Sequence, residues 1–570
     1  MNFICFDTED NSKELLEAGK SGFDKKVTQI AAMTAEGKHY YTPGNVKHFL
    51  KWLERQPEVF IYSLNIGYDL GNLFGDKLDT LDVVMVGGRI IRANWRNKTF
   101  VDVFNIWPMS VKKLGEAFNL AKLETASMAT DRDYVMRDVE IIRAAMLFAW
   151  TFANENGIDR LPATLGGLCV KLWQHWGGEN SHDSNELSRE ALFGGRVELF
   201  KAHNDTPDVC WVDINSLYPF VMQKEFPAAC EDYGAKLAPH GVARVRVKVP
   251  RRAICVLPFR NPEGRIYYPW GEFSGTWTIA ELNAAVARGT IIESVESCWG
   301  TAETEKPYGN FVARCYDLRL RSETPAEKLF YKLLMNNLYG RLGASGVIGR
   351  TVWQDETNCT DGVPYGDKVL MNYHLPLSAE TNWLHAAHVT AYGRLELLKY
   401  LELIGPDKMI YCDTDSAIFD CPGRQIPFPI GAELGAMKAE KHCAHCGKGF
   451  NDGATPCCKQ PTAENFWPNC VPFAPKLYRA SKTYKAKGIP VRLAKQFIET
   501  GKAAFDLPFK FREAARFYDE RRDAKGKVTN KKNSHKLSVW RRVTKEKRSD
   551  YDKKILKKNR YFPCKIIQTA

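Results

Sequence analysis

The sequence contains no apolar run that approaches the roughly 20 residues needed to cross a bilayer, so we expect no membrane-spanning segment. Its first residues lack the basic, apolar and cleavage-site order of a signal peptide and lead instead into Asp7-Thr8-Glu9. Internal repeats and long low-complexity stretches are missing as well. These absences favour a globular protein that stays in the cytoplasm.

Disulfide bonds are not expected either, although the chain has 16 cysteines. In a large chain without a signal peptide, cysteines are usually reduced thiols, and some of them bind metal. The 570 residues, of which 44% are hydrophobic and 12% aromatic, are enough to bury several cores. The length predicts about three or four domains.

Acidic residues are scarce at the C-terminal end. Residues 521–570 hold 18 Lys and Arg against 4 Asp and Glu, so the excess behind the net charge of +13 is concentrated there. Apolar residues such as Leu537, Trp540 and Tyr561 are interleaved with these cations, which favours a folded basic surface that binds a polyanion. The alternative is a disordered basic tail.

The periodicity of apolar residues divides the chain into two units. We expect an α/β domain over residues 1–175, a connection rich in Gly, Asn and Ser at 176–190, and a larger second unit over 190–570. The elements predicted in the first domain are strands at Phe3 to Phe6, Val59 to Tyr62, Val83 to Val86 and Phe100 to Phe104, and a helix from Tyr134 to Ala153. Strands near 209–214 and 409–419 are predicted in the second unit.

Two carboxylates, Asp413 and Asp415, interrupt an apolar, strand-like run from Met409 to Phe419. A buried pair of like charges is costly unless cations neutralise it, and Mg²⁺ favours carboxylate oxygens while it keeps positions open for phosphate. The pattern therefore indicates a metal site for phosphoryl transfer. An ordinary hairpin turn is the alternative, because Asp and Thr also stabilise such turns.

A helix is predicted after Thr324, which supplies an N-cap, with Pro325 at the first position, Glu327 at the third and Gly340 after the last turn. The spacing places two cations, an amide and an aromatic ring on one face of this helix. These residues are Lys328, Lys332, Asn336 and Tyr339. Such a face suits a triphosphate and a base, although the solvent side of a core helix is the alternative.

Three segments in this order resemble motifs of the family B DNA polymerases: Asp213 to Pro219 (D-x-x-S-L-Y-P), Lys332 to Gly340 (K-x-x-x-N-x-x-Y-G) and Tyr411 to Ser416 (Y-x-D-T-D-S). The resemblance implies that Asp213 and Asp415 hold two Mg²⁺ or Mn²⁺ ions, with Asp413 beside them. It implies that Tyr218 closes the sugar pocket against a 2′-hydroxyl and that Lys332 neutralises the triphosphate. The other nucleotide-binding residues that it implies are Ser216, Leu217, Lys328, Asn336 and Tyr339. Asn337 replaces a Ser that the family often has, so we expect altered nucleotide contacts without loss of activity.

Two further segments resemble DNA-binding motifs of the same family. Lys476-Leu477-Tyr478 resembles the K-x-Y motif that grips the primer terminus, and Lys482-Thr483-Tyr484 has the same pattern and is the second candidate. Phe193-Gly194-Gly195 resembles the Y-x-G-G segment that links the two domains and contacts the template. Phe in place of Tyr removes a hydroxyl donor and keeps a stacking face.

The first domain carries acids of its own. Asp7 and Glu9 lie two residues apart on one face of a strand, and Tyr134 and Asp138 lie on one face of a helix. With Asn65 to Asp69, they resemble the D-x-E, N-x-x-Y-D and Y-x-x-x-D motifs of family B 3′-5′ exonucleases. The resemblance implies that Asp7, Glu9, Asp69 and Asp138 bind two metal ions, that Tyr134 orients the attacking water, and that Asn65 and Tyr68 hold the single-stranded 3′ end.

One exonuclease motif is incomplete. Asp102-Val103-Phe104 lies where the family has an S/T-L pair, and the catalytic Lys is either Lys122 or absent. Weaker proofreading than usual is therefore expected.

The size of the chain and two long intervals, from Tyr218 to Lys332 and from Gly340 to Tyr411, resemble the protein-primed polymerases of phages and linear plasmids. In that subfamily one insertion contacts a separately encoded terminal protein, and the other helps to encircle DNA and open the duplex. The domains expected from this resemblance are a palm with insertions at 219–310 and 346–405, fingers at 311–345, palm again at 406–475 and a thumb at 489–570.

A cysteine cluster lies within the expected palm. Cys443 and Cys446 form a C-x-x-C pair with Gly447, and Cys457 and Cys458 follow after a polar loop. This pattern predicts a structural Zn²⁺ in an insertion at 440–460, with His ligands or Cys470 as further candidates. Reduced structural thiols are the alternative.

The sequence thus predicts an α/β and α+β multidomain chain: an RNase-H-like exonuclease domain followed by a right-hand polymerase domain. The expected function is DNA synthesis with proofreading, by a monomer that takes primer-template DNA and deoxynucleoside triphosphates, in the host cytoplasm if the element is viral or a plasmid. One alternative is a primer-independent family B polymerase. Another is a DNA-binding replication factor with nuclease activity only.

Overall fold

The computed structural model describes most of the chain up to residue 440 and shorter segments beyond it. The described residues are 2–11, 26–75, 80–86, 89–124, 130–179, 183–201, 208–262, 264–344, 347–353, 363–365, 368–374, 380–440, 442–443, 463–464, 466–467, 470–474, 476–480, 483–486, 495, 509–515, 539–545, 554–557 and 560–568. Among these residues, no helix is long and apolar enough to cross a membrane.

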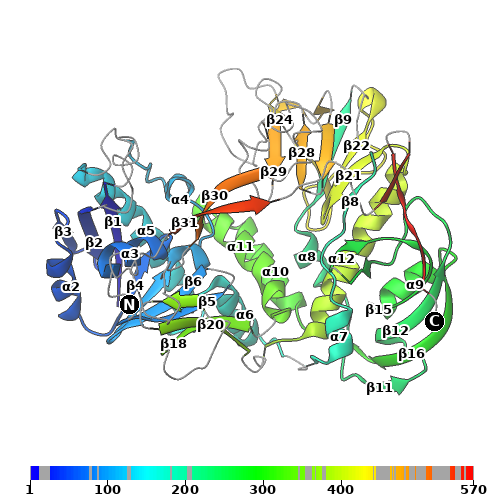
Figure 1. Ribbon diagram of the computed structural model, residues 1–570, viewed down its shortest axis with the longest axis horizontal. Coiled ribbons are helices and arrows are strands. Elements are labelled where there is room, and N and C mark those ends of the chain that lie inside the picture. Colours follow the sequence, from blue (N-terminus) through cyan, green and yellow to red (C-terminus); the bar gives the residue numbers. More distant parts are fainter. Residues whose placement is uncertain are drawn as a thin grey trace, which may run out of the picture.

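A ten-stranded sheet organises the N-terminal part, at the left of Figure 1. Its order is β19-β20-β18-β5-β6-β7-β4-β1-β2-β3, and the pairs β1 with β4 and β4 with β7 are parallel. The strands are β1 (Phe3–Asp10), β2 (Val27–Thr34), β3 (His39–Thr42), β4 (Val59–Ser63), β5 (Asp82–Val86), β6 (Arg89–Trp95), β7 (Lys98–Asp102), β18 (Val347–Trp353), β19 (Val363–Tyr365) and β20 (Lys368–His374). All predicted strands of this region are present.

Both faces of this sheet are covered. Successive residues of β1 point to opposite sides of the sheet, and the residues on each side are buried in a core. Phe3 and Cys5 pack into the core beneath the long helix, while Ile4 and Phe6 pack into a second core. The helices of this part are α2 (Val46–Glu54), α3 (Ile66–Phe74), α4 (Val111–Ala117), α5 (Arg132–Glu155) and α6 (Leu165–His175). Burial on both faces explains why the first half of β1, Phe3 to Phe6, is apolar at every position.

The strand predicted from Phe100 to Phe104 ends earlier than expected. β7 stops at Asp102, whose carboxylate caps the short 3₁₀ helix η3 (Val103–Asn105) by accepting from the Phe104 main-chain nitrogen at 2.9 Å. An acceptor two residues upstream favours a turn over a continued strand.

The sheet also crosses a predicted domain boundary. β18 pairs antiparallel with β5, with Gly349 opposite Met85 and Arg350 opposite Val84. Residues 347–374 were expected in an insertion of the second unit, yet their strands extend the sheet of the first. Strand pairing between such distant segments carries no local signal, so the sequence pattern did not reveal it.

A helical hairpin links the two ends of the molecule in Figure 1: α10 (Gly309–Leu320) and α11 (Pro325–Leu342). The predicted start of α11 is confirmed, with Thr324 and Glu327 in a capping box and Pro325 in the first turn. The predicted end at Gly340 is wrong, because the helix continues to Leu342 and Gly343 is its C-cap. Gly340 faces open space, while Leu342 is fully buried and holds the last turn against the core.

A second sheet has the order β23-β9-β22-β21-β8, and β26 also pairs with β9. Its strands are β8 (Val197–Leu199), β9 (Val209–Ile214), β21 (Met409–Asp413), β22 (Ser416–Asp420), β23 (Met437–Ala439) and β26 (Phe466–Trp467). α8 (Leu217–Val221) and α12 (Trp383–Ile404) pack beside it, and the short 3₁₀ helix η5 (Pro422–Arg424) follows β22. α12 lies within the predicted second insertion, but it is buried along most of its length and contacts α8, α9 and β22.

A third sheet, at the right of Figure 1, follows the order β11-β16-β12-β15-β34. Its strands are β11 (Glu231–Gly234), β12 (His240–Val249), β15 (Trp270–Thr278), β16 (Ile291–Thr301) and β34 (Lys565–Ile567), with α9 (Ile279–Val286) and α7 (Glu186–Glu190) against it. β34, from the end of the chain, pairs in parallel with β15. The predicted thumb range therefore ends on the first predicted insertion.

The remaining strands form small ladders. β27 (Cys470–Ala474), β28 (Leu477–Ala480) and β29 (Thr483–Ala486) make a three-stranded sheet. Two-stranded pairs are β10 (Phe226–Pro227) with β17 (Thr304–Glu305), β13 (Phe259–Arg260) with β14 (Ile266–Tyr267), β24 (His442–Cys443) with β25 (Ala463–Glu464), β30 (Phe509–Ala515) with β31 (Val539–Lys545), and β32 (Lys554–Lys557) with β33 (Arg560–Pro563).

Candidate active sites

The first carboxylate site lies at the end of the second sheet. β21 and β22 form a tight hairpin in which Asp413 pairs with Ser416, and Thr414 at its tip adopts a left-handed conformation with φ of 62°. Ser416 also pairs with Asp213 on β9. The main-chain nitrogen of Ile214 donates to the Asp415 carbonyl at 2.7 Å. The register therefore brings Asp213, Asp413 and Asp415 to one end of the sheet, as the sequence predicted.

Burial and mutual repulsion disfavour the charged forms of two of these acids. Burial, and then the neighbouring Asp415, raise the pKa of Asp213 to about 7. Burial, with the charge of Asp413, raises the pKa of Asp415 to about 6. Two such carboxylates suit a divalent cation, because the cation stabilises the negative charge on both.

Asp413 has a different environment, because Lys476 neutralises it. The Lys476 Nζ donates to both carboxylate oxygens, at 2.6 and 2.8 Å, and the Tyr411 hydroxyl donates to Oδ2 at 3.0 Å. The Tyr478 ring packs on Tyr411 with centroids 5.4 Å apart and is buried. The structure thus places the predicted K-x-Y motif directly on the carboxylate hairpin.

The Phe-Gly-Gly segment approaches the same hairpin closely. A Cβ on Gly195 would lie 2.6 Å from the Thr414 hydroxyl oxygen, so only glycine fits there. The Thr414 main-chain nitrogen donates to the Arg196 carbonyl at 2.7 Å, and Gly194 faces open space. The expectation for Phe193 needs correction: the residue is 5% exposed, and its ring lies under Arg260, so it packs into the protein and offers no open stacking face.

Two aromatic rings stand beside the carboxylates. Tyr218 on α8 and Tyr339 on α11 have centroids 4.8 Å apart. Burial, and then the neighbouring Tyr339, raise the pKa of Tyr218, and the charges of Asp415 and Asp413 add to this. Ser216, with φ of 49°, turns the chain from β9 into α8, and Leu217 is buried beneath that turn.

The polar face of α11 is only partly gathered at the site. Burial and the nearby Lys438 lower the pKa of Lys332, which also interacts with Asp213. Asn336 donates from its side chain to the Lys332 carbonyl at 2.7 Å, and Lys328 is exposed near the start of the helix. The structure brings Lys332 and Tyr339 to the carboxylates, while Asn336 is engaged with its own helix.

Sequence reasoning missed two cations of this region. Lys438 on β23 lies opposite Asp213 in register, with its Nζ 3.7 Å from Asp213 Oδ1. Arg394 on α12 is buried and donates to the carbonyls of Phe193 and Gly194 at 3.1 and 2.7 Å. Lys438 lies between short predicted segments and Arg394 within an apolar helix, so neither carried a local signal.

The second carboxylate site lies on the N-terminal sheet. Asp7 and Glu9 of β1 and Asp138 of α5 each offer an oxygen, and these atoms lie within 4.8 Å of one another. Asp138 Oδ1 is buried without a hydrogen-bond partner among the described residues. An orphaned carboxylate oxygen beside two others fits a divalent cation.

Asp69 adjoins this trio and is held rigidly. It accepts from the Thr8 main-chain nitrogen at 3.0 Å, the Thr8 hydroxyl at 2.7 Å and the Ser63 hydroxyl at 2.6 Å. Burial is nevertheless the largest influence and raises the pKa of Asp69 to about 7. Burial and the charge of Asp138 raise the pKa of Glu9 to about 7, and burial with the charge of Asp69 raises that of Asp7 well above its usual range.

The uncertain lysine of this site is Lys122, which the structure brings into contact. Its ammonium pairs with Asp138 and lies 4.3 Å from the centre of the Tyr134 ring. Asp102 has a structural position, accepting from the Asn65 main-chain nitrogen at 2.9 Å while Asn65 holds φ of 64°. Tyr68, in the first turn of α3, is 36% exposed.

The predicted zinc ligands fall almost entirely outside the described part of the chain. Cys446, Cys457 and Cys458 lie outside the described residues, and only the backbone of Cys443, in β24, is described.

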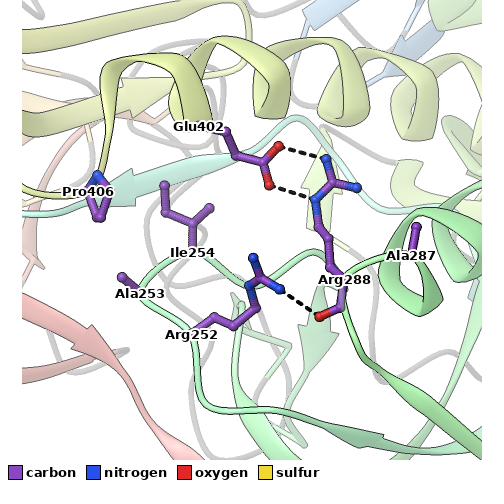
Figure 2. Close-up of a pocket in the computed structure, with 7 residues that line it drawn as sticks. All are labelled: Arg252, Ala253, Ile254, Ala287, Arg288, Glu402 and Pro406. Carbon is purple, nitrogen blue, oxygen red and sulfur yellow. Dashed lines mark hydrogen bonds and ion pairs between the residues drawn. The ribbon is translucent and has the colours of Figure 1, made fainter.

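A depression of about 620 Å³ lies apart from both carboxylate sites, at the junction of α9 and α12 (Figure 2). Arg288 there forms a double hydrogen bond with Glu402, at 2.6 and 2.7 Å, and Arg252 donates to the Arg288 carbonyl at 2.7 Å. These contacts join the first predicted insertion to α12. No acid of either carboxylate site lines the depression.

Comparison with known proteins agrees with the motifs. Residues 132–369 match the family described as DNA polymerase type B, organellar and viral. A probable DNA polymerase of Ascobolus immersus is 27% identical over 321 residues, 52% of this chain and 24% of that protein. One of Neurospora intermedia is 30% identical over 302 residues, 45% of this chain and 29% of that protein. Primer-independent DNA polymerase PolB of Escherichia coli is 25% identical over 416 residues, 60% of this chain and 46% of that protein. The chain therefore covers less than half the length of each relative.

Solved structures extend the likeness over nearly the whole chain. Phi29 DNA polymerase complexed with primer-template DNA and incoming nucleotides superposes with a TM-score of 0.67 at 16% identity, over 95% of this chain and 99% of that one. An orthorhombic crystal form of the same protein also gives 0.67, at 15% identity, over 90% and 97% of the two chains. At such identities the likeness establishes a shared mixed α/β multidomain fold.

Proposed function

We propose that this chain, which resembles the family B DNA polymerases of organelles and viruses, is a DNA-directed DNA polymerase with a separate 3′-5′ exonuclease site. The observation that carries the proposal is the convergence of Asp213 and Asp415 at one sheet end, with pKa values raised to about 7 and about 6. Two buried acids in that state suit the divalent ions of nucleotidyl transfer.

The polymerase reaction is the attack of a primer 3′-hydroxyl on the α-phosphate of a deoxynucleoside triphosphate. Asp213 and Asp415 would hold two Mg²⁺ or Mn²⁺ ions, which stabilise charge on the attacking and leaving oxygens when bound. Lys332 neutralises the triphosphate, and the rings of Tyr218 and Tyr339 border the sugar and base of the incoming nucleotide. Lys476, which pairs with Asp413, would grip the primer terminus together with Tyr478 of the K-x-Y segment.

The exonuclease reaction is hydrolysis of the last phosphodiester of a single-stranded 3′ end. Asp7, Glu9, Asp69 and Asp138 would hold divalent ions, which activate a water when bound. Tyr134 and Lys122 lie together beside Asp138 and orient the attacking water and the scissile phosphate. Tyr68 offers its exposed ring, and Asn65 its amide, to the unpaired end.

We propose two macromolecular partners, a terminal protein and duplex DNA. We assign the sheet of β11, β12, β15 and β16 to an insertion that contacts a separately encoded terminal protein, which primes synthesis. The basic C-terminal region would hold the duplex, with strong salt dependence. The protein would act as a monomer in the host cytoplasm, and a structural Zn²⁺ at the cysteine cluster would pin residues 440–460.

A second candidate is a polymerase that starts without a primer. The similarity to primer-independent PolB, which covers 60% of this chain, favours it. Both candidates use the same carboxylates, so only initiation separates them.

The test is nucleotide incorporation on a single-stranded circle with and without an annealed primer, read on a denaturing gel. Asp415→Asn is the polymerase control and Asp7→Asn the exonuclease control. Products that need a primer, and exceed the circle in length, support a strand-displacing replicase of the protein-primed type. Products without a primer that vanish in Asp415→Asn support the second candidate. Degradation of the DNA without synthesis, with or without a primer, would mean that the protein has nuclease activity only.

A further inference from the structure

Gly393 lies inside α12, a long buried helix, although glycine is less favourable than alanine in a helix interior. A glycine kept in such a place usually permits a close approach of another element. The element here is α8, because a Cβ on Gly393 would lie 3.1 Å from Tyr218 Cε1 and 3.4 Å from Tyr218 Cδ1. The backbone of α12 at Gly393 therefore packs directly against the Tyr218 ring.

A second helix also contacts the Tyr218 ring. Tyr339 of α11 lies with its centroid 4.8 Å from that of Tyr218, at an interplanar angle of 50°. Leu217, the residue before Tyr218, would be 3.4 Å from the same Cβ and is itself buried. The Tyr218 ring thus contacts two helices, α11 and α12. Its position depends on how closely the backbone of α12 approaches it.

We propose that Gly393 is a specificity-determining residue, which sets the depth of the Tyr218 ring and thereby the discrimination between deoxyribose and ribose in the incoming nucleotide. The proposal rests on the proposed polymerase function, in which Tyr218 borders the sugar. Gly393 itself touches no substrate and acts by positioning. A side chain at 393 would displace the Tyr218 ring away from α12, because its Cβ would lie 3.1 Å from Tyr218 Cε1. We expect this displacement to narrow the space for the sugar.

The test compares single-nucleotide incorporation of a deoxynucleoside and a ribonucleoside triphosphate by wild-type protein and Gly393→Ala. We expect Gly393→Ala to raise KM for the deoxynucleotide about threefold with little change in kcat, and to lower use of the ribonucleotide further, so that sugar selectivity rises by about threefold or more. Gly166→Ala is the matched control. Gly166 is also helical and faces open space, so that variant should match wild type in both constants.

The double variant decides whether Tyr218 transmits the effect. In a Tyr218→Ala background, adding Gly393→Ala should leave sugar selectivity unchanged, because no ring remains to displace. An equal change in both backgrounds, or wild-type selectivity in Gly393→Ala, overturns the proposal. If Gly393→Ala fails to fold, a folded double variant supports the clash with Tyr218, and an unfolded one rejects it.

Failure of the proposed function gives a different result. Wild-type protein would then incorporate neither nucleotide, and both the function and the inference would be rejected. Active wild-type protein with an unaltered Gly393→Ala rejects the inference alone.

Discussion

Lys476 donates from its Nζ to both carboxylate oxygens of Asp413, at 2.6 and 2.8 Å, and from its main chain to the Tyr411 hydroxyl at 2.9 Å. Tyr411 in turn donates to Asp413 at 3.0 Å. One lysine therefore fixes the hairpin that carries Asp413 and Asp415, and it pairs directly with the first of them. Lys438 and Lys476 also act on Asp415, yet burial still raises the pKa of Asp415 to about 6.

We expect Lys476→Met to lower primer extension by roughly tenfold or more, because the hairpin loses its anchor and small displacements of reacting groups are costly. The measurement is steady-state extension of a labelled primer. Lys399→Met is the matched control, since Lys399 is an exposed lysine on α12 that pairs with Glu396. Equal activity of Lys476→Met and the control would contradict a positioning role for Lys476.

Asp138→Asn should reduce exonuclease activity by about a hundredfold or more, because it removes a charge from the trio of Asp7, Glu9 and Asp138. Primer extension should persist, since the second sheet carries its own acids. Release of a labelled 3′-terminal nucleotide from single-stranded DNA measures the first activity. Loss of both activities in a folded variant would argue against two separate sites.

Stability should depend on pH and metal together. Burial and like charges raise the pKa of Glu9 and of Asp69 to about 7, so without metal the folded chain binds more protons than the unfolded chain. Stability then falls as pH rises from about 4.5 to about 7, because protons that favour the folded state are lost. Mg²⁺ bound by these acids would replace the protons, and its binding should become tighter as pH rises.

The increase in melting temperature on adding Mg²⁺ should therefore be larger at about pH 8 than at about pH 6. Differential scanning fluorimetry with Mg²⁺ or with a chelator measures it. In a Glu9→Gln variant, the rise in melting temperature caused by Mg²⁺ should depend less on pH, since one of the acids of the site is gone. A metal effect that is greater at the lower pH would show that these acids do not bind the ion.

Arg394 and Glu281 form a buried ion pair between α12 and α9, with the Arg394 Nε 2.8 Å from Glu281 Oε1. Arg394→Met should destabilise the fold by about 3 to 5 kcal/mol, because it leaves Glu281 charged, buried and unpaired. Adding Glu281→Leu should recover part of the loss. The exposed pair of Arg321 and Asp317 is the control, where Arg321→Met should cost no more than about 1 kcal/mol. The midpoint of urea unfolding measures all three variants.

Local patterns were enough to predict several elements. The capping residues of α11 were identified from Thr324, Pro325 and Glu327, because each acts within one helical turn. Asp413 and Asp415 were singled out because two carboxylates interrupt an apolar run, and the hairpin turn that the sequence offered as the alternative interpretation is present between them. The end of α11 and the end of β7 were misplaced, since tertiary packing at Leu342 and a side-chain cap from Asp102 outweighed the local signals.

Longer-range features could not be predicted in the same way. The pairing of β18 with β5, and of β34 with β15, joins segments more than two hundred residues apart. The buried ring of Phe193 lies under Arg260 of β13 and Arg394 of α12, which are remote from it in the chain. Neither relationship leaves a periodicity or a spacing in the residues concerned.

The sequence by itself indicated which acids lie together within each segment, because strand alternation, helical spacing and turn chemistry act over a few neighbouring residues. The resemblance of the motifs to one family implied which of these segments meet. Only the tertiary structure decided how those acids are surrounded: that Lys476 neutralises Asp413, that Lys438 faces Asp213, that Lys122 joins Asp138, and that Gly393 backs Tyr218. The physical reason is that charge neutralisation and close packing depend on distances between segments remote in the chain, and these distances are fixed only when the sheets and helices pack together.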